Sequence, residues 1–215
     1  MEEKTLYLPT EHNDRIVAFI GSPLGLLAAW LVLGAAHFGS DALAKAQGRL
    51  AEETMAVTDW QLVGLTQNED GTLTTVDGDP QMILENVDGR VVRTISYTAQ
   101  FDGEAREMCL YYTTKVGEDY SADRRVFPQS VGEGRYIYTL PRTSLAALRL
   151  DPCSPEENKT VTLAVRDITL NAVDTLPAVW QYFVPTWYQA FCLVLYPALA
   201  AAAVSMIFAV LKKEK

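Results

Sequence analysis

Hydrophobic residues concentrate at the two ends of this 215-residue chain. Residues 16–38 read IVAFIGSPLGLLAAWLVLGAAHF without a charged side chain, and residues 187–211 form a second uncharged run. A helix of about 20 apolar residues spans the hydrocarbon core of a bilayer. The pattern therefore predicts transmembrane helix 1 at 16–38, and an interfacial aromatic segment with transmembrane helix 2 at 179–211.

The flanks of the second run predict its orientation. An aromatic cluster precedes it, and the basic sequence KKEK follows it at 212–215. Aromatic residues favour the membrane interface, and basic residues favour the cytoplasmic side. We therefore expect a two-pass protein of the cell membrane, embedded in the lipid bilayer. Its cytoplasmic tails are 1–15 and 212–215, and the middle of the chain is extracytoplasmic.

A cleaved signal peptide is the alternative interpretation of the first run. Ala42, Leu43 and Ala44 resemble a cleavage site with small residues. Against cleavage, the run is longer than the 7–15 apolar residues usual in signal peptides, and the tail before it is net acidic rather than basic. We expect the helix to be retained.

Small residues predict close helix packing. Gly21 and Gly25 form a GxxxG pair, and Ala198, Ala202 and Ser205 offer a small face on the second run. Such positions let helix backbones approach closely. The sequence allows two interpretations. Either the two helices of one chain pack together through these small residues, or the small residues form a dimer contact or bind another membrane protein.

Between the helices the pattern changes from helical to alternating. A helical stalk is predicted at 39–53, and an extracytoplasmic β-sandwich at 54–178. Asp-Gly and other glycine turns separate short β-rich runs, which is typical of antiparallel sheets. The predicted fold is an all-β sandwich, jelly-roll-like, flanked by two transmembrane α-helices. The runs are 57–66, 72–76, 81–86, 90–98, 107–114, 135–140, 145–150 and 160–170.

The last β-rich run changes phase. Leu163 and Val165 share one parity, whereas Ile168 and Leu170 share the other. Side chains alternate strictly along a regular strand, and one extra residue reverses the parity. A β-bulge near Asp167 is therefore predicted.

Aromatic residues near polar ones are the candidates for ligand binding. Sugars present apolar faces that stack on aromatic rings, while their hydroxyl groups need polar partners. The two residues nearest to predicted loops, Trp60 and Tyr120, are expected to be the least core-like. The alternative is that these aromatic residues belong to the hydrophobic core. The four candidates are Trp60, Tyr111, Tyr120 and Tyr136.

The stretch LRLDP favours a corner of the fold over a site. Pro152 has no N–H to donate to a strand ladder, and Asp151 can cap the turn that follows. Arg149 is expected to pair with an acidic residue across the sheet, such as Asp167.

The sequence offers one candidate metal site and one candidate disulfide bond. Asp70, Asp77 and Asp79 offer oxygen ligands for a structural calcium ion, but not at the spacing of an EF-hand loop. No other cofactor is expected. Cys109 and Cys153 both lie in the predicted extracytoplasmic part, where one disulfide bond between them is permitted.

Charge and histidine content narrow the function classes. The whole net charge of −9 falls between the tails, so nucleic acid is not an expected partner. The two histidines, His12 and His37, lie outside the predicted sandwich, which removes histidine-dependent nucleophilic catalysis there. We expect no enzyme, although the abundant carboxylates leave a glycosidase-like pair open.

Four motifs resemble a known group of domains. They are MCLYYTTKVGEDYSADRRVFPQ, RYIYTLP, LAALRLDP and VRDITL, in that order within about residues 76–172. They are similar to the galactose-binding-like or jelly-roll ectodomains of bacterial membrane proteins of cell-surface polysaccharide assembly. The resemblance implies a surface β-sandwich associated with glycan chemistry, but the large catalytic membrane domain usual there is missing from this sequence.

Two functions follow as expectations. The leading one is a non-enzymatic module that binds cell-envelope glycan, or supports a membrane glycosylation complex beside a glycosyltransferase or other membrane protein. The alternative is a transmembrane interaction subunit or sensor whose sandwich contacts a protein partner. A groove of exposed aromatic residues favours the first function, and a flat apolar patch with helix dimerisation favours the second.

Overall fold

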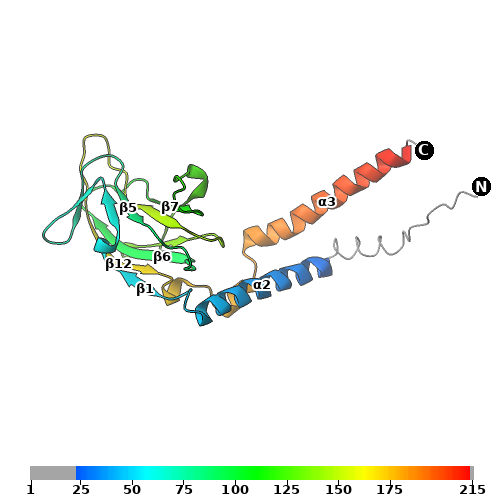
Figure 1. Cartoon of the computed structure of the whole chain (residues 1–215). Coiled ribbons are helices and arrows are strands. Elements are labelled where there is room, and N and C mark those ends of the chain that lie inside the picture. Colours follow the sequence, from blue (N-terminus) through cyan, green and yellow to red (C-terminus); the bar gives the residue numbers. More distant parts are fainter. Residues whose placement is uncertain (1–22, 214–215) are drawn as a thin grey trace, which may run out of the picture. The chain divides into compact units, whose positions relative to one another are not determined.

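A computed structural model of the chain describes residues 23–213, which divide into two compact units (Figure 1). Residues 41–176 form one unit, here called the β domain. The described residues outside it, 23–40 and 177–213, form the other, here called the helical unit.

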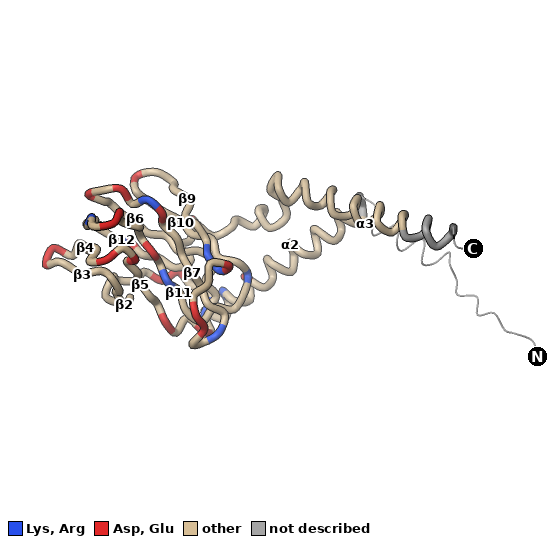
Figure 2. The backbone as a smooth tube through the Cα atoms, turned by 90° about the horizontal axis from the view of Figure 1, so that it is seen from above, with Lys and Arg blue, Asp and Glu red and all other residues tan. Residues whose placement is uncertain are grey.

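Two apolar helices dominate the helical unit. They are α2 (Pro23–Ala46), whose last residues belong to the β domain, and α3 (Trp187–Lys213). The segments Gly25–Ala46 and Trp187–Val204 are long and apolar enough to cross a membrane, and only 11% of the first and none of the second is buried. Figure 2 shows that charged residues gather on the β domain and are missing from the coloured part of α3. The two predicted apolar helices are thus present over the described residues, and residues 16–22 of the first lie outside these residues.

The β domain contains two antiparallel sheets. Sheet A has seven strands in the order β3-β4-β12-β6-β10-β9, with β1 also pairing with β12. Sheet B has five strands in the order β2-β5-β11-β7-β8. The bounds in sheet A are β1 (Glu53–Met55), β3 (Leu65–Gln67), β4 (Leu73–Thr75), β6 (Thr94–Phe101), β9 (Gln129–Ser130), β10 (Arg135–Thr139) and β12 (Thr162–Leu170). Those in sheet B are β2 (Gln61–Val63), β5 (Gln81–Leu84), β7 (Cys109–Thr113), β8 (Arg125–Val126) and β11 (Ala147–Asp151).

Short 3-10 helices complete the described elements. They are η1 (Val57–Asp59), η2 (Ala122–Arg124), η3 (Val173–Thr175) and η4 (Val179–Tyr182).

One hydrophobic core joins the two sheets. Leu163 and Tyr97 come from sheet A, and Leu110 and Leu150 come from sheet B, and all four are buried in the same cluster. Alternation explains the choice of residues, because every second side chain of a strand points to the same face. The opposite faces of the sheets therefore carry the polar residues.

The predicted bulge in β12 is confirmed. The register of β12 against β6 shifts between Arg166 and Thr169, and Asp167 adopts a φ of 55°. Val165 and Ile168 are consequently both buried, although their positions have opposite parity and would face opposite sides of a regular strand. One extra residue thus keeps both hydrophobic parities of β12 in the core.

A buried asparagine fastens the end of β12. Asn171 adopts a φ of 54° and is 2% exposed. Its side-chain oxygen accepts a hydrogen bond from the backbone N–H of Arg93 at 2.7 Å. Its amide nitrogen donates to the carbonyls of Val91 at 2.8 Å and Ala51 at 3.2 Å. One side chain therefore satisfies three backbone groups from two segments.

Several sequence-based boundaries differ from the structure. The helix ends at Ala46, and β1 begins at Glu53, so only the first part of the predicted stalk at 39–53 is helical. The compact β domain runs from 41 to 176 rather than from 54 to 178. The predicted run 57–66 is broken into η1, β2 and β3, because Gly64 adopts a φ of 64° between the two strands.

We predict that Asn171→Ala lowers the free energy of unfolding of the β domain by about 3 kcal/mol, because it loses three hydrogen bonds and strains the left-handed backbone. Denaturant unfolding of the full chain in detergent, followed by circular dichroism, measures this change. Asn158 is the matched control, since it has a φ of 62° on an exposed residue. Asn158→Ala should cost only about 1 kcal/mol. Equal losses in the two variants would contradict the role of the Asn171 hydrogen bonds.

Candidate functional site

The candidate site is the face of sheet B that points away from the core. Strand register aligns one residue from each strand across it, and four of these five side chains are half-buried while the fifth is exposed. We call this surface the sheet B face. The aligned residues are Arg125, Tyr111, Arg149, Ile83 and Gln61.

Tyr111 lies between two guanidinium groups. The guanidinium carbon of Arg149 is 5.1 Å from the centre of the Tyr111 ring, within cation–π range. On the other side of Tyr111, Arg125 pairs with Glu107 at 2.8 Å and lies 4.7 Å from the ring of Phe127. Burial raises the pKa of Tyr111, so its hydroxyl is neutral at physiological pH and can both donate and accept hydrogen bonds.

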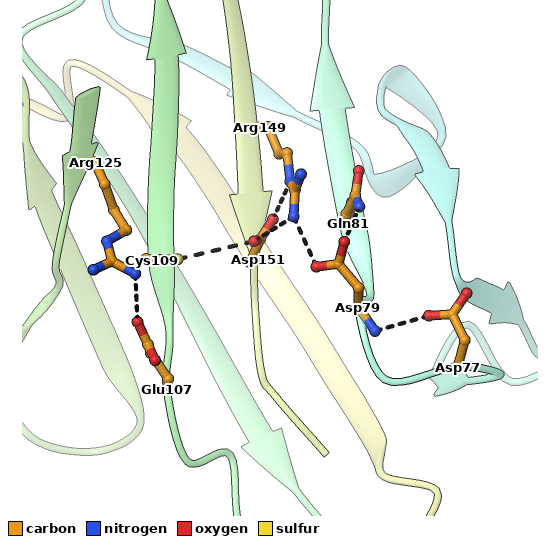
Figure 3. A network of polar contacts seen from close by, with 8 residues as sticks. All are labelled: Asp77, Asp79, Gln81, Glu107, Cys109, Arg125, Arg149 and Asp151. Atoms are coloured by element: carbon orange, nitrogen blue, oxygen red, sulfur yellow. Dashed lines mark hydrogen bonds and ion pairs between the residues drawn. The ribbon is translucent and has the colours of Figure 1, made fainter. Parts of the chain in front are cut away.

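Arg149 is oriented by carboxylates from two segments (Figure 3). Its Nε and Nη2 donate to the two oxygens of Asp151 at 2.7 and 2.8 Å. Nη2 also donates to Asp79 at 2.7 Å. Burial raises the pKa of Asp151, and the hydrogen bond from Arg149 opposes this shift. The predicted partner of Arg149, Asp167, was wrong: the structure places Asp151 and Asp79 there.

Tyr120 belongs to a loop held near the same face. Glu118 accepts hydrogen bonds from the backbone N–H and hydroxyl of Thr114 at 3.0 and 3.1 Å, and pairs with Arg124 at 2.5 Å. The hydrogen bond from Arg124 lowers the pKa of Glu118 to about 2. The pKa of Tyr120 is raised by burial and by the charge of Glu85, and Arg149 lowers it.

Of the four aromatic candidates, the structure places Tyr111 on the sheet B face, with Arg149 beside its ring. Tyr120 lies in the loop between β7 and η2. Tyr136 belongs to β10 of sheet A, where it packs against Phe101 and Tyr97.

Trp60 corrects an expectation. The sequence placed it near a loop and away from the core, but it is 3% exposed and belongs to the core cluster. Its indole nitrogen has no hydrogen-bond partner among the described residues. A side chain with this burial cannot stack on a ligand in the observed conformation.

The aspartates proposed for calcium have other partners. Asp70 accepts hydrogen bonds from the backbone N–H and hydroxyl of Thr72, and Asp79 is engaged by Arg149 and Gln81. Asp77 accepts a hydrogen bond from the backbone N–H of Asp79 at 2.9 Å. Over residues 23–213, no group of three or more His, Cys, Asp or Glu is arranged to hold a metal ion. The structure does not assemble the predicted calcium site.

The cysteines also depart from expectation. Cys109 and Cys153 are both buried free thiols rather than a disulfide pair. The Cys109 sulfur lies 3.9 Å from a carboxylate oxygen of Asp151. Burial, followed by the charge of Asp151, raises the pKa of each thiol to about 11. Both are therefore protonated at neutral pH.

The predicted GxxxG pair lies partly outside the described residues, because Gly21 precedes them, and Gly25 is buried. The observed close approach of α2 is at Gly34, where an added Cβ would lie 2.5 Å from the carbonyl oxygen of Tyr182. Nearby, the indole N–H of Trp30 donates to the carbonyl of Phe183 at 2.9 Å.

Sequence reasoning missed the two arginines beside Tyr111. Alternation does place Arg149 and Tyr111 on outward faces of their own strands. The missing information is the register, since β7 pairs with β11 across a long intervening segment. That pairing is set by tertiary contacts and has no local signal.

No protein-family model matches the chain, and no curated protein matches it. Among the solved structures that match, three are similar to part of this chain at a low level. A low-affinity xylan-binding module from Roseburia intestinalis has 14% identity and a TM-score of 0.36, over 56% of this chain and 94% of that one. The adhesin domain K2 of Lys-gingipain has 14% identity and a TM-score of 0.36, over 57% of this chain and 100% of that one.

The third is a family two carbohydrate esterase from Cellvibrio japonicus, with 12% identity and a TM-score of 0.33, over 57% of this chain and 36% of that one. Likeness of this degree does not indicate a shared activity, so the chemistry of the sheet B face must carry the functional conclusion.

We predict that Arg124→Gln raises the pKa of Glu118 from about 2 towards 4.5, because it removes the largest influence that lowers this pKa. Carbon-13 NMR titration of the full chain measures the change, with Arg166→Gln as a control on an exposed arginine. Since the folded-state pKa is depressed, the pair stabilises the fold above pH 4.5 and this contribution is lost as the pH falls towards 2. A Glu118 pKa unaffected by Arg124→Gln would refute the assignment.

We predict that the unreduced, denatured chain titrates with three thiols, because the structure contains three free cysteines. Cys192→Ala should titrate with two, and these two should react slowly in the native chain, since both are buried. Ellman's reagent measures both quantities. A result of one thiol for the wild-type chain would instead establish a disulfide bond.

Proposed function

We propose that this chain is a non-enzymatic, membrane-anchored module whose extracytoplasmic β domain binds cell-envelope glycan through the sheet B face. One observation carries the proposal: Tyr111 lies between Arg149 and Arg125 on a face of five paired strands. An aromatic ring offers stacking to the apolar face of a sugar, and the fixed guanidinium and carboxylate groups offer hydrogen bonds to its hydroxyls.

The rigidity of the face supports binding. Tyr111 and Arg149 stand on neighbouring strands whose alternate residues, Leu110 and Leu150, are fully buried. Arg149 is also fixed by Asp151 and Asp79. Side chains held in this way lose little conformational entropy when a ligand binds, which favours affinity.

Membrane anchoring is supported by the two apolar helices. The candidate spans of α2 and α3 carry few buried residues, so their apolar side chains need an apolar environment. The aromatic residues Trp180, Trp187 and Tyr188 are exposed near the start of α3, as is typical of a membrane interface. With Lys212 and Lys213 at its other end, this polarity supports cytoplasmic termini and a β domain outside the cytoplasm.

A second candidate function is an interaction subunit that binds another membrane protein. The observation that favours it is an apolar groove of about 470 Å³ in the helical unit. Trp30 from α2 and the small residues Ala198 and Ala201 from α3 line it. Small residues in such a groove permit close approach of a further helix.

We predict that the full chain in nanodiscs binds an envelope glycan saturably, and that Tyr111→Ala and Tyr120→Ala each weaken this binding about tenfold, because each removes a stacking ring. A glycan array followed by calorimetry makes the measurement. Tyr136→Phe is the control, since Tyr136 lies in sheet A. If the folded wild-type chain binds no glycan, the proposal fails and the interaction subunit is favoured.

A further inference from the structure

A polar cavity of about 490 Å³ lies in the β domain, lined by residues that do not belong to the sheet B face. We call it the arginine pocket. Four of the 18 lysines and arginines of this acidic chain line it. These are Arg49, Arg90, Arg93 and Arg142, and the hydroxyl-bearing residues Thr143 and Ser144 lie beside them.

Two of the arginines are fixed by one buried carboxylate. Arg93 donates from Nε and Nη2 to one oxygen of Asp41, at 3.0 and 2.9 Å. Arg142 donates to both oxygens of Asp41, at 2.9 and 2.5 Å. The side chain of Asp41 is 5% exposed, and that of Arg93 is 12% exposed. The two guanidinium groups are therefore held in place before any ligand arrives.

The positive charges of the other two arginines, Arg49 and Arg90, are less fully neutralised by carboxylates. Arg49 donates from Nε and Nη2 to the amide oxygen of Gln47, a neutral group, at 2.9 and 2.7 Å. Arg90 pairs with Glu53 at 2.9 Å, and both of these side chains are more than 40% exposed. Exposed pairs of this kind are weak and exchange readily with other partners. These are six charged groups, and the four arginines outnumber the two carboxylates, Asp41 and Glu53, by two.

We propose that the arginine pocket binds the phosphate group of a phosphate mono- or diester. A guanidinium group matches phosphate oxygens with two parallel N–H donors, so a pocket lined by four arginines suits this anion. Thr143 and Ser144 add hydroxyl donors for the phosphate or for an attached alcohol. The volume falls within the range of about 300–1,000 Å³ that is usual for small-molecule sites.

The ester group has two chemical sources. One is a soluble phosphorylated sugar or polyol. The other is a phospholipid headgroup, since Asp41 follows the last apolar residue of the predicted first span, Phe38, by only three residues. The lipid source depends on the proposed membrane anchoring, whereas the soluble source does not. Neither source depends on glycan binding at the sheet B face.

The test compares Arg49→Gln/Arg90→Gln with the control Arg106→Gln/Arg166→Gln, which removes the same charge from exposed positions elsewhere in the β domain. The full chain is first titrated with glycerol 3-phosphate and with inorganic phosphate by calorimetry, in a non-ionic detergent that contains no phosphate. In a second arm, nanodiscs containing phosphatidylglycerol are exchanged into detergent, and native mass spectrometry counts the phosphatidylglycerol molecules that the chain retains.

The expected result is saturable binding in at least one arm, weakened about tenfold or more by Arg49→Gln/Arg90→Gln and unchanged in the control, because charge-assisted hydrogen bonds to phosphate are lost. Binding of glycerol 3-phosphate identifies the soluble source, and retained lipid alone identifies the headgroup. The proposal is overturned if the wild-type chain binds neither probe, or if the control variant loses as much binding. Unaltered thermal unfolding of both variants verifies the fold, and Arg49→Lys provides a milder variant that keeps the charge and should lose less binding.

Discussion

The ion cluster of Asp41 with Arg93 and Arg142 holds the last turns of α2 against the strands of the β domain. A buried charge costs several kcal/mol unless it is paired, and Arg93 and Arg142 supply the positive charge that Asp41 needs. Arg93 immediately precedes β6, and Arg142 lies in the segment between β10 and β11. The cluster therefore ties the last turns of α2 to both sheets, since β6 belongs to sheet A and β11 to sheet B. The backbone of Arg93 is held in turn by Asn171.

Alternation along strands gives the two proposed sites different physical origins. In sheet B, each buried leucine of β7 and β11 is followed by an outward residue, so the same strands form both the core and the sheet B face. The arginine pocket instead comes from loops and from the segment after α2, where the polar groups are positioned by ion pairs rather than by a ladder. The first surface suits a neutral polyhydroxylated ligand, and the second suits an anion.

Local patterns in the sequence predicted the features that depend on neighbouring residues. The parity change between Val165 and Ile168 was sufficient to locate the bulge at Asp167. The apolar runs predicted the helices, and turn density predicted antiparallel sheets. Features that depend on distant residues were not predicted. Trp60 is buried by tertiary packing, and Arg149 forms an ion pair with Asp79 instead of Asp167. The arginines that line the arginine pocket come from positions 49, 90, 93 and 142, which are distant in the sequence. Strand register and side-chain convergence are global properties of the fold, and no local period encodes them.

The bulge at Asp167 also affects how the chain should be compared with more distant relatives. A homologue without the extra residue would need its apolar side chains at the opposite parity on one side of this point. An alignment that matches β12 without a gap would then pair buried positions with exposed ones over half of the strand. A single-residue insertion placed at Asp167, which is exposed and has a positive φ, keeps both halves of β12 in structural correspondence.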